Sequence, residues 1–258
     1  MIGSGQSALY QADSKAVANA KVRNDLTLIE KYQSLAGYDR RMAATGESET
    51  AQRASDRRHS VTYMSAAANL ASRVDPRQLD AMAWGLADTR EHRGRLFILG
   101  VGGGAGHASH AVNDFRKLCA LESYAPTDNV SELTARTNDD GWETSFSAWL
   151  AVSHVCERDA LLVFSVGGGS REHNVSVNLV RAMEAACAAG SPLYGVVGAP
   201  GGTLAELADV AILIEPPPAL RTPLVESFQA IVWHALVSHP ALAVAQGHWE
   251  SLTAASPP

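Results

Sequence analysis

Short apolar runs alternate with segments of helical periodicity from Arg95 onward. Continuous apolar runs of this length are typical of strands that are buried on both faces of a parallel sheet. The runs lie at 96–101, 160–166, 193–198 and 210–214, with a further short strand expected near 121–124. Helical patterns lie between and after them, over about 105–119, 142–157, 174–189, 202–208 and 223–238. This alternation predicts an α/β fold, with a doubly wound parallel sheet and helices on both faces.

The first part of the chain lacks the alternation of apolar runs and helical segments. Residues 1–58 are polar, which predicts a helical and linker extension ahead of an α/β domain over 59–258. Within and after this extension the pattern predicts a helix over 16–35, a loop at Ala43–Ser48, a helix over about 60–73 and a helix from Asp75-Pro76 to about His92. Asp before Pro is a favourable N-cap and first-turn pair.

Composition narrows the function classes. The chain has 258 residues, 46% of them hydrophobic, and a formal net charge of -6. Basic residues form no stripe, so a nucleic-acid partner is not expected. No apolar run approaches the ~20 residues of a membrane span, and no leader pattern opens the chain, so we expect a cytoplasmic protein without a membrane partner. The three cysteines lack a CxxC spacing, which indicates buried free thiols rather than disulfides or a cysteine zinc site.

Glycine-rich loops follow two of the expected strands. One is the run Gly100–Gly106 and the other is Ser165–Ser170, and each precedes an expected helix. Backbone N–H groups in such a loop and at the following helix N-terminus can bind a phosphate. A dinucleotide fingerprint would need an acidic residue at the end of the next strand, which has no clear counterpart here. A third loop, 198–203, can be a plain turn, and all three can be tight turns without a ligand.

These segments carry a family resemblance over about residues 60–240. The run 96–105 resembles the first strand and GNGGSA loop of phosphoheptose isomerases, which have the SIS (sugar isomerase) fold, flavodoxin-like in architecture. Asn138-Asp139-Asp140-Gly141 resembles an Asn-Asp-x-Gly stretch of that family, Ser165–Ser170 its STSGNS phosphate loop, and 195–202 its fourth-strand region. The resemblance implies an aldose–ketose isomerase, with sedoheptulose 7-phosphate as the expected substrate and a metal-assisted enediol mechanism.

The resemblance also implies a site. Positions that carry zinc ligands in the family correspond to His110, Asp114, Glu226 and His234, so zinc or another divalent metal is expected as cofactor. His110 and Asp114 are four residues apart, which places them on one helix face. The catalytic groups expected are Asp114 or Glu226 as acid/base and His234 as partner. The substrate-binding residues expected are Gly103, Gly104, Asp128, Asn138, Asp139, Ser165, Gly167, Ser170 and Arg171.

The sequence departs from the family at several of these positions. Asp114 stands for a glutamate and Glu226 for a glutamine, while Gly104 and Gly167 replace two serines. The loop after Ser170 is longer, which brings Arg171 near as a substitute phosphate contact. These changes favour a divergent substrate or altered phosphate binding.

Alternatives remain for the residues and for the function. His110 can cap or pack, Asp114 can pair with Arg116 or Lys117, Glu226 can simply favour a helix N-terminus, and His234 can be a core histidine. The rival functions are an isomerase of another long-chain ketose phosphate, such as an octulose phosphate in secondary metabolism, and a non-catalytic SIS protein that binds sugar phosphates as a regulator. The resemblance further implies a homo-oligomer, a tetramer or dimer, whose sites neighbouring subunits complete.

Overall fold

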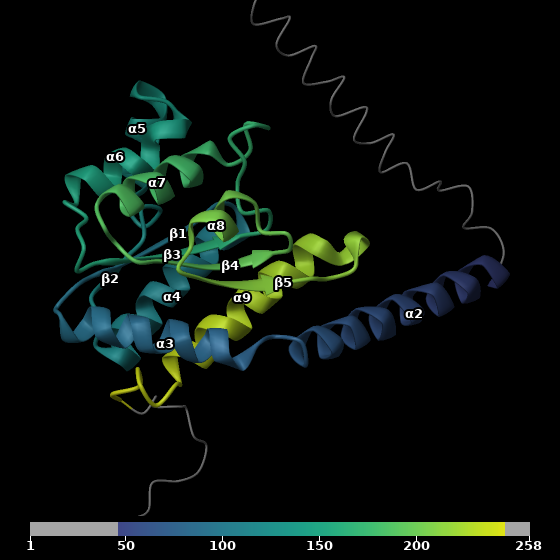
Figure 1. The fold of residues 1–258 in the computed structure, drawn as a ribbon. Coiled ribbons are helices and arrows are strands. Elements are labelled where there is room, and N and C mark those ends of the chain that lie inside the picture. Colours follow the sequence, from purple (N-terminus) through teal and green to yellow (C-terminus); the bar gives the residue numbers. More distant parts are fainter. Residues whose placement is uncertain (1–45, 246–258) are drawn as a thin grey trace, which may run out of the picture. The chain divides into compact units, whose positions relative to one another are not determined.

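The computed structural model describes residues 46–245 (Figure 1). The strands are β1 Leu96–Gly100, β2 Ser123–Tyr124, β3 Ala160–Ser165, β4 Leu193–Gly198 and β5 Val210–Ile214. The helices are α2 Gly46–Ala71, α3 Pro76–Glu91, α4 Gly103–Cys119, α5 Val130–Asp139, α6 Ser145–Val152, α7 Val177–Ala188, α8 Gly202–Leu207 and α9 Arg221–Val237, with short 3-10 turns at Trp142–Thr144 and Pro218–Leu220.

All strands pair in parallel, in the order β2-β1-β3-β4-β5. The predicted doubly wound parallel sheet is therefore confirmed, and this order is the flavodoxin-like one. The chain first leaves β1 to form β2 on one side and then crosses to β3 on the other. In open sheets of this kind, ligands bind beyond the carboxyl ends of the strands at this switch point. The loops that follow β1 and β3 are thus the first place to look for a site.

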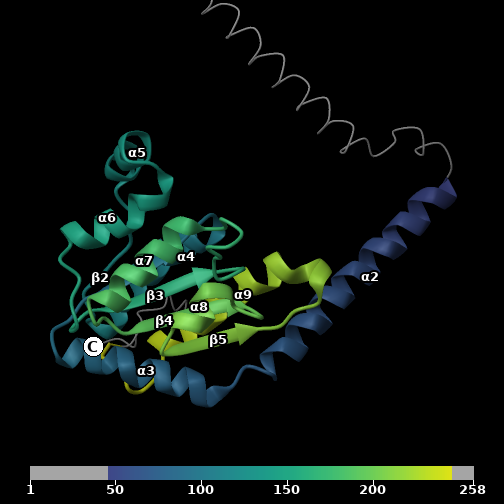
Figure 2. The same ribbon diagram turned by 45° about the horizontal axis from the view of Figure 1, so that its top comes forward.

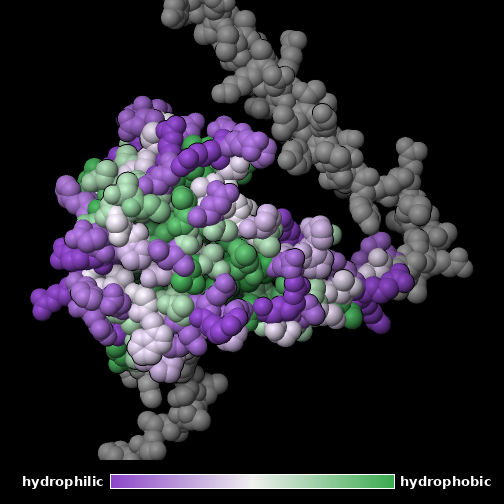
Figure 3. Space-filling view, in the orientation of Figure 1, coloured by the Kyte–Doolittle hydropathy of each residue, from purple (hydrophilic) through white to green (hydrophobic). Residues whose placement is uncertain are grey.

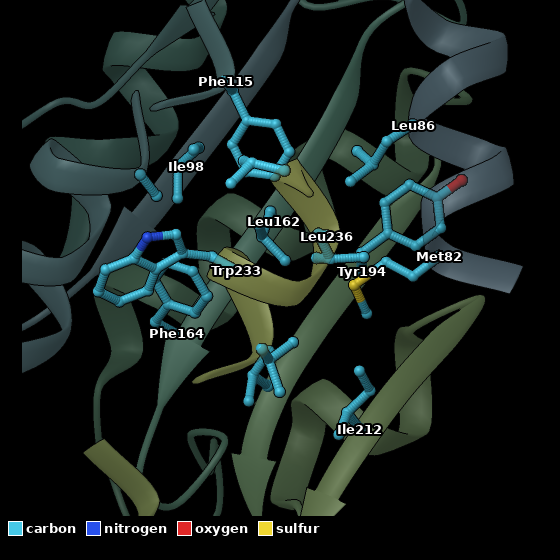
Figure 4. Packing of buried hydrophobic residues seen from close by; sticks show 14 of the residues in the cluster. Met82, Leu86, Ile98, Phe115, Leu162, Phe164, Tyr194, Ile212, Trp233 and Leu236 are labelled. Carbon is cyan, nitrogen blue, oxygen red and sulfur yellow. The ribbon is translucent and has the colours of Figure 1, made fainter. Parts of the chain in front are cut away.

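Helices cover both faces of the sheet (Figures 1 and 2). One core cluster joins the sheet to α3, α4, α9 and the last turns of α2, with Phe115, Trp233 and Leu236 among its buried side chains. Figure 4 shows the Trp233 ring beside Phe164 at one edge of this cluster. The second cluster lies under α6, α7 and α8 and includes Phe97 and Phe146. Since successive strand residues point to opposite faces, strands buried on both faces need this continuous apolar sequence.

Several predicted elements differ from the observed ones. The predicted loop at Ala43–Ser48 is wrong from Gly46 onward, because α2 begins there; the sequence after it is rich in Glu, Ala, Gln and Arg, which favour a helix. The remainder of that loop and the helix predicted over 16–35 lie outside the described residues. The helix expected over 142–157 ends at Val152, where the chain turns through His154 at φ 52°.

Helix α5 was not predicted, although its start carries a local signal. Asn129 is its N-cap, and the Asn129 side chain accepts a hydrogen bond from the backbone N–H of Glu132. An Asn followed three residues later by Glu is a capping-box type of start. Asp75 is the N-cap of α3 as predicted, with Pro76 at the first helical position.

The chain divides into two compact units at Val61–Thr62. In the second unit, Figure 3 shows apolar residues gathered in the middle of the visible face, over α8 and β5, with hydrophilic residues around them. Leu213 on the edge strand β5 contributes to the exposed apolar surface. No helix within 46–245 is long and apolar enough to cross a bilayer.

The cysteines are free, as predicted, but not all are buried. Cys119 is buried, Cys156 is half-buried and Cys187 is exposed, which corrects the expectation of uniformly buried thiols. Burial raises the pKa of the Cys119 thiol to about 11, so this thiol is protonated near neutral pH and is a packing group.

An ion pair between the buried Asp159 carboxylate and the partly buried Arg95 guanidinium joins the amino ends of β1 and β3. Asp159 is 2% exposed and accepts hydrogen bonds from the Arg95 guanidinium, from the Arg95 backbone N–H and from the Cys156 backbone N–H. Arg95 in turn donates to the carbonyls of Ser153 and His154. The pair therefore holds the turn after α6 against the amino ends of the strands, at the end of the sheet opposite the glycine loops.

Candidate active site

The first two glycine loops leave the sheet side by side. Gly100 ends β1 and lies opposite Phe164 of β3 in the parallel register. Gly104, in the first turn of α4, sits so close to the Phe164 carbonyl that an added Cβ would lie 2.8 Å from the oxygen. The backbone can approach this tightly because Gly104 has no side chain. The loss of the family's serine at this position therefore accompanies close packing of α4 on β3.

The loop after β3 is held open by its own serines. The Ser165 hydroxyl oxygen accepts the backbone N–H of Gly168 at 2.9 Å, and the Ser170 hydroxyl oxygen accepts that of His173 at 3.2 Å. Ser170 and Val175 also exchange two backbone hydrogen bonds of 2.9 Å, which fold the longer segment into a hairpin turn. Because each serine oxygen already accepts a bond, each hydroxyl hydrogen is left to donate to a ligand.

The third glycine loop supports the second. Backbone N–H groups of Thr203 and Leu204 donate to the carbonyls of Gly169 and Gly168, at 3.1 and 3.0 Å. Gly168 has φ 80°, and a Cβ added to it would lie 1.7 Å from the Gly201 carbonyl oxygen. The third loop is thus more than a plain turn, since it fixes the backbone of the loop after β3.

Replacing Gly168 with alanine is expected to destabilise the fold by about 1–3 kcal/mol, because the new methyl group meets a backbone oxygen at a positive φ. Gly167→Ala is the matched control, since an added Cβ at Gly167 meets nothing within 4 Å and its φ is not in the left-handed region. Urea unfolding of both variants measures the difference. Equal stability of the two variants would show that the contact between the loops is not tight.

Three ligand-type side chains come together between α4 and α9. The Asp114 Oδ2 atom lies 3.5 Å from His110 Nε2 and 3.7 Å from His234 Nε2. One donor atom from each residue lies within 4.8 Å of the other two. His110 and Asp114 share a face of α4, as their spacing predicted. The two histidine side chains are 55% and 53% exposed, so His234 is not a core histidine.

Hydrogen bonds orient two of these three groups. Trp233 is buried, and its indole N–H donates to Asp114 Oδ2 at 3.1 Å, while the Asn113 amide donates to Oδ1 at 3.0 Å. The Nδ1 atom of His234 lies 2.8 Å from the Ala230 carbonyl oxygen. A carbonyl can only accept, so Nδ1 carries a hydrogen, and in a neutral ring the Nε2 lone pair is then available as a ligand atom on the side of Asp114. Two imidazoles and one carboxylate fit a divalent metal such as zinc, with outer hydrogen bonds of the usual kind.

Glu226 lies elsewhere in the described conformation. Its carboxylate sits over Gly103, where an added Cβ would come within 2.6 Å of it. Glu226 and His234 are eight residues apart on α9, about 12 Å along the helix axis. The structure therefore brings three of the four expected metal ligands together, and places Glu226 at the glycine-loop end of the same helix.

Glu226 and the cluster of His110, Asp114 and His234 form a row between α4 and α9, and the remaining predicted residues are placed as follows. Gly103, Gly104, Ser165, Gly167 and Ser170 belong to the two loops already described. The Asp128 carboxylate accepts a hydrogen bond from the Ser109 hydroxyl of α4, next to His110. Asn138 and Asp139 bond to each other at the exposed end of α5, which packs with α6 on the opposite face of the sheet from α4. Arg171 pairs with Glu184 of α7, so in this conformation its guanidinium is engaged by a carboxylate.

Sequence reasoning missed His107 and Gln229. The His107 Nδ1 atom lies 2.8 Å from the Gln229 Oε1 atom, which joins α4 to α9 between the Glu226 and Asp114 contacts. Helical spacing could have indicated His107, because it precedes His110 by three residues and Asp114 by seven and so lies on the same face of the helix. Gln229 gave no local signal, since its partner is distant in the sequence.

Comparisons with known proteins identify relatives of this chain. No family model matches the chain. The chain is 35% identical to the lincomycin biosynthesis protein LmbN of Streptomyces lincolnensis over 191 residues, which cover 68% of this chain and 66% of that protein. It is 32% identical to a phosphoheptose isomerase of Rhodospirillum rubrum over 148 residues, which cover 55% of this chain and 73% of that protein.

Solved structures match the fold. The phosphoheptose isomerase GmhA from Neisseria gonorrhoeae superposes with a TM-score of 0.62 at 23% identity, covering 70% of this chain and 97% of that one. A phosphoheptose isomerase from Francisella tularensis gives 0.61 at 20% identity, covering 71% and 94%. These structures show the fold, and the 32% identity over 73% of the Rhodospirillum rubrum protein shows that the chain belongs to the phosphoheptose isomerase family of SIS-domain sugar-phosphate isomerases.

Proposed function

We propose that this protein interconverts an aldose phosphate and a ketose phosphate beyond the carboxyl ends of β1 and β3. The observation that carries the proposal is the convergence of His110, Asp114 and His234 between α4, the helix that follows the first glycine loop, and α9. Family membership supports the reaction class. A non-catalytic sugar-phosphate sensor would have no need of two imidazoles, one of them oriented by a hydrogen bond, around a buried carboxylate.

We assign the metal to His110, Asp114 and His234, with zinc as the expected ion. A bound divalent ion would polarise the sugar carbonyl and stabilise the negative charge that develops on its oxygen. Trp233 and Asn113 hold the Asp114 carboxylate in position, and Ala230 holds the His234 ring. The site fits the ion on the residues' own chemistry, because two neutral imidazoles and one carboxylate are a common zinc donor set.

Isomerisation moves one proton between two carbons and another between two oxygens. Both oxygens of Asp114 already accept hydrogen bonds, so Asp114 is better suited to hold and orient than to exchange protons. Glu226 lies over Gly103 at the glycine-loop end of the row and is the carboxylate we assign to the carbon-bound proton. His234 acts with Asp114 at the other end, where its Nε2 atom faces the carboxylate.

We assign the phosphate end of the substrate to the loop after β3. Ser165 and Ser170 can each donate a hydroxyl hydrogen, because their oxygens already accept a backbone N–H. The backbone of the loop after β3 adds N–H groups, whereas the backbone around Gly103 lies under the Glu226 carboxylate and is left to that group. These donors can replace the two hydroxyls that the family has at Gly104 and Gly167. Arg171 would join them only on release from Glu184.

Sedoheptulose 7-phosphate is the first substrate we propose, after the family's name-giving reaction. The likeness to a lincomycin biosynthesis protein supports a second candidate substrate, a longer ketose phosphate such as an octulose phosphate in secondary metabolism. We also propose a cytoplasmic homo-oligomer, a dimer or tetramer, with the domain at 59–258 and the extension at 1–58. The high exposure of His110 and His234 supports a site that a second copy covers.

A panel of ketose phosphates of seven and eight carbons, assayed for aldose formation with and without a chelator, tests the function. We expect turnover on one of them, a loss of at least about tenfold on chelation, and recovery on adding zinc. Metal content of the purified protein is measured in parallel, and sedimentation gives its oligomeric state. Tight binding of a ketose phosphate without turnover in the zinc-loaded protein would instead favour the sensor.

A further inference from the structure

His107 lies on α4 between Gly103, in the first glycine loop, and the cluster of His110, Asp114 and His234. Along α4 it follows Gly103 by one turn and precedes His110 by one turn, on the face that α9 covers. Its ring lies 5.1 Å from the Trp233 ring, whose indole N–H holds Asp114. The ring is half-buried rather than enclosed. His107 therefore lies between Glu226 and the cluster of His110, Asp114 and His234, the groups assigned to the isomerisation.

The contact with Gln229 sets the tautomer of His107. The Gln229 Oε1 atom lies 2.8 Å from Nδ1, and an amide oxygen can only accept, so Nδ1 carries the hydrogen in this orientation. The Nε2 atom of a neutral ring then keeps its lone pair. The ring can accept a proton at Nε2 and give it back while the Gln229 bond stays intact.

Gln229 is unfavourable for stability where it lies. Its side chain is fully buried, and its Nε2 atom has no hydrogen-bond partner among residues 46–245. A buried amide that is satisfied on one side only costs free energy that an apolar side chain of similar size would not. Such unsatisfied groups in a native protein call for an explanation, and orienting a functional side chain is one. Within the part of the chain that the structure describes, the one hydrogen bond of the Gln229 side chain is that to His107.

We propose that His107 moves the oxygen-bound proton in the isomerisation, with Gln229 as its positioning residue; this rests on the proposed function. In the aldose-to-ketose direction, Nε2 accepts the hydrogen from the C2 hydroxyl and returns it to the C1 oxygen. The carboxylate of Glu226 moves the other hydrogen from C2 to C1. Each group ends in its starting protonation state, so the cycle needs no further reactant.

The test compares His107→Gln with His92→Gln in the full chain loaded with zinc. His92 is the matched control, since its Nδ1 atom also lies 2.9 Å from a carbonyl oxygen, that of Asp88, on the exposed end of α3. We expect His107→Gln to lower kcat about 10²-fold, with KM and bound zinc unchanged. Exchange of the carbon-bound hydrogen with deuterated water should fall much less, because another group moves that proton. His92→Gln should match the wild type.

Gln229→Met is the second variant, because it keeps the volume and removes the acceptor. We expect it to lower kcat about tenfold while the midpoint of urea unfolding stays the same or rises. A structural role for the pair predicts the opposite, lower stability with kcat per folded molecule unchanged, and that result would overturn the assignment. Equal losses of turnover and of hydrogen exchange in His107→Gln would also overturn it.

Different results would overturn the proposed isomerase function and the role of His107. A wild-type protein with bound zinc that turns over none of the ketose phosphates would overturn the proposed function, and the role of His107 with it. Wild-type turnover together with full activity of His107→Gln would overturn only the role of His107. In the folded wild type, a neutral His107 with its hydrogen on Nε2, seen by nitrogen NMR, would likewise overturn the tautomer argument.

Discussion

Asp114→Asn is expected to lower kcat/KM by about 10³-fold on whichever ketose phosphate the wild type converts. The carboxylate lies within 3.5 and 3.7 Å of two imidazole nitrogens and is 8% exposed. Asparagine keeps the shape but removes the charge, so the pair of histidines loses its anionic partner and a bound metal loses a ligand. The amide also cannot accept from both Trp233 and Asn113, because only one of its two terminal atoms is an acceptor.

The measurement is steady-state turnover together with metal content after dialysis. Asp80→Asn is the control, since Asp80 is an exposed carboxylate on α3 that also lies near a histidine, His239, at 3.3 Å. We expect Asp80→Asn to retain full activity and full metal content. If Asp114→Asn retained both as well, the metal and catalytic assignment at this cluster would be wrong.

Asp159→Ala is expected to destabilise the protein by about 3 kcal/mol, because a buried carboxylate that accepts hydrogen bonds from two backbone N–H groups and from Arg95 is removed. The Arg95 guanidinium loses its carboxylate, and the backbone N–H groups of Arg95 and Cys156 lose their acceptor. For a domain of this size the melting temperature should fall by about 6–12 °C. Asp88→Ala is the control, because that carboxylate is 70% exposed. Equal melting temperatures for the two variants would contradict the expected role of the pair.

The same pair makes an acid-dependent contribution to stability. Burial acts to raise the pKa of Asp159, but the hydrogen bonds from Arg95 and from the Cys156 backbone outweigh it and hold the pKa below its usual range. A carboxyl whose pKa is lowered by folding stabilises the fold fully above its unfolded pKa of about 3.9, and this contribution is lost as the pH falls through the lower folded value. The stability gap between wild type and Asp159→Ala should therefore be constant from about pH 5 to 8 and shrink below about pH 4. Urea unfolding at several pH values measures it, and a gap that widens in acid would contradict this reasoning.

Local features of the candidate site could be predicted because they depend on short spacings. His110 and Asp114 share a helix face by virtue of the i, i+4 repeat, and the glycine loops follow apolar runs whose short length favours buried strands over helices. Helix α5 was missed although its cap signal was present at Asn129. The end of α6 at Val152 was missed because the turn that follows depends on Arg95, which lies far away in the sequence and binds the carbonyls of Ser153 and His154.

The sequence by itself determined the parallel α/β fold, the Asp75 start of α3 and the pairing of His110 with Asp114. Each of these follows from apolar periodicity, capping chemistry or helical repeat within a few residues. Only the tertiary structure decided which face of α9 meets α4. The rotation of α9 about its own axis is set by the packing of Trp233 and its neighbours in the core, more than a hundred residues from α4 in the sequence. As a result Glu226 lies at Gly103, Gln229 at His107, and the Trp233 indole on Asp114. Hydrogen bonds between distant helices have no repeat in the sequence, so they appear only once the helices are packed.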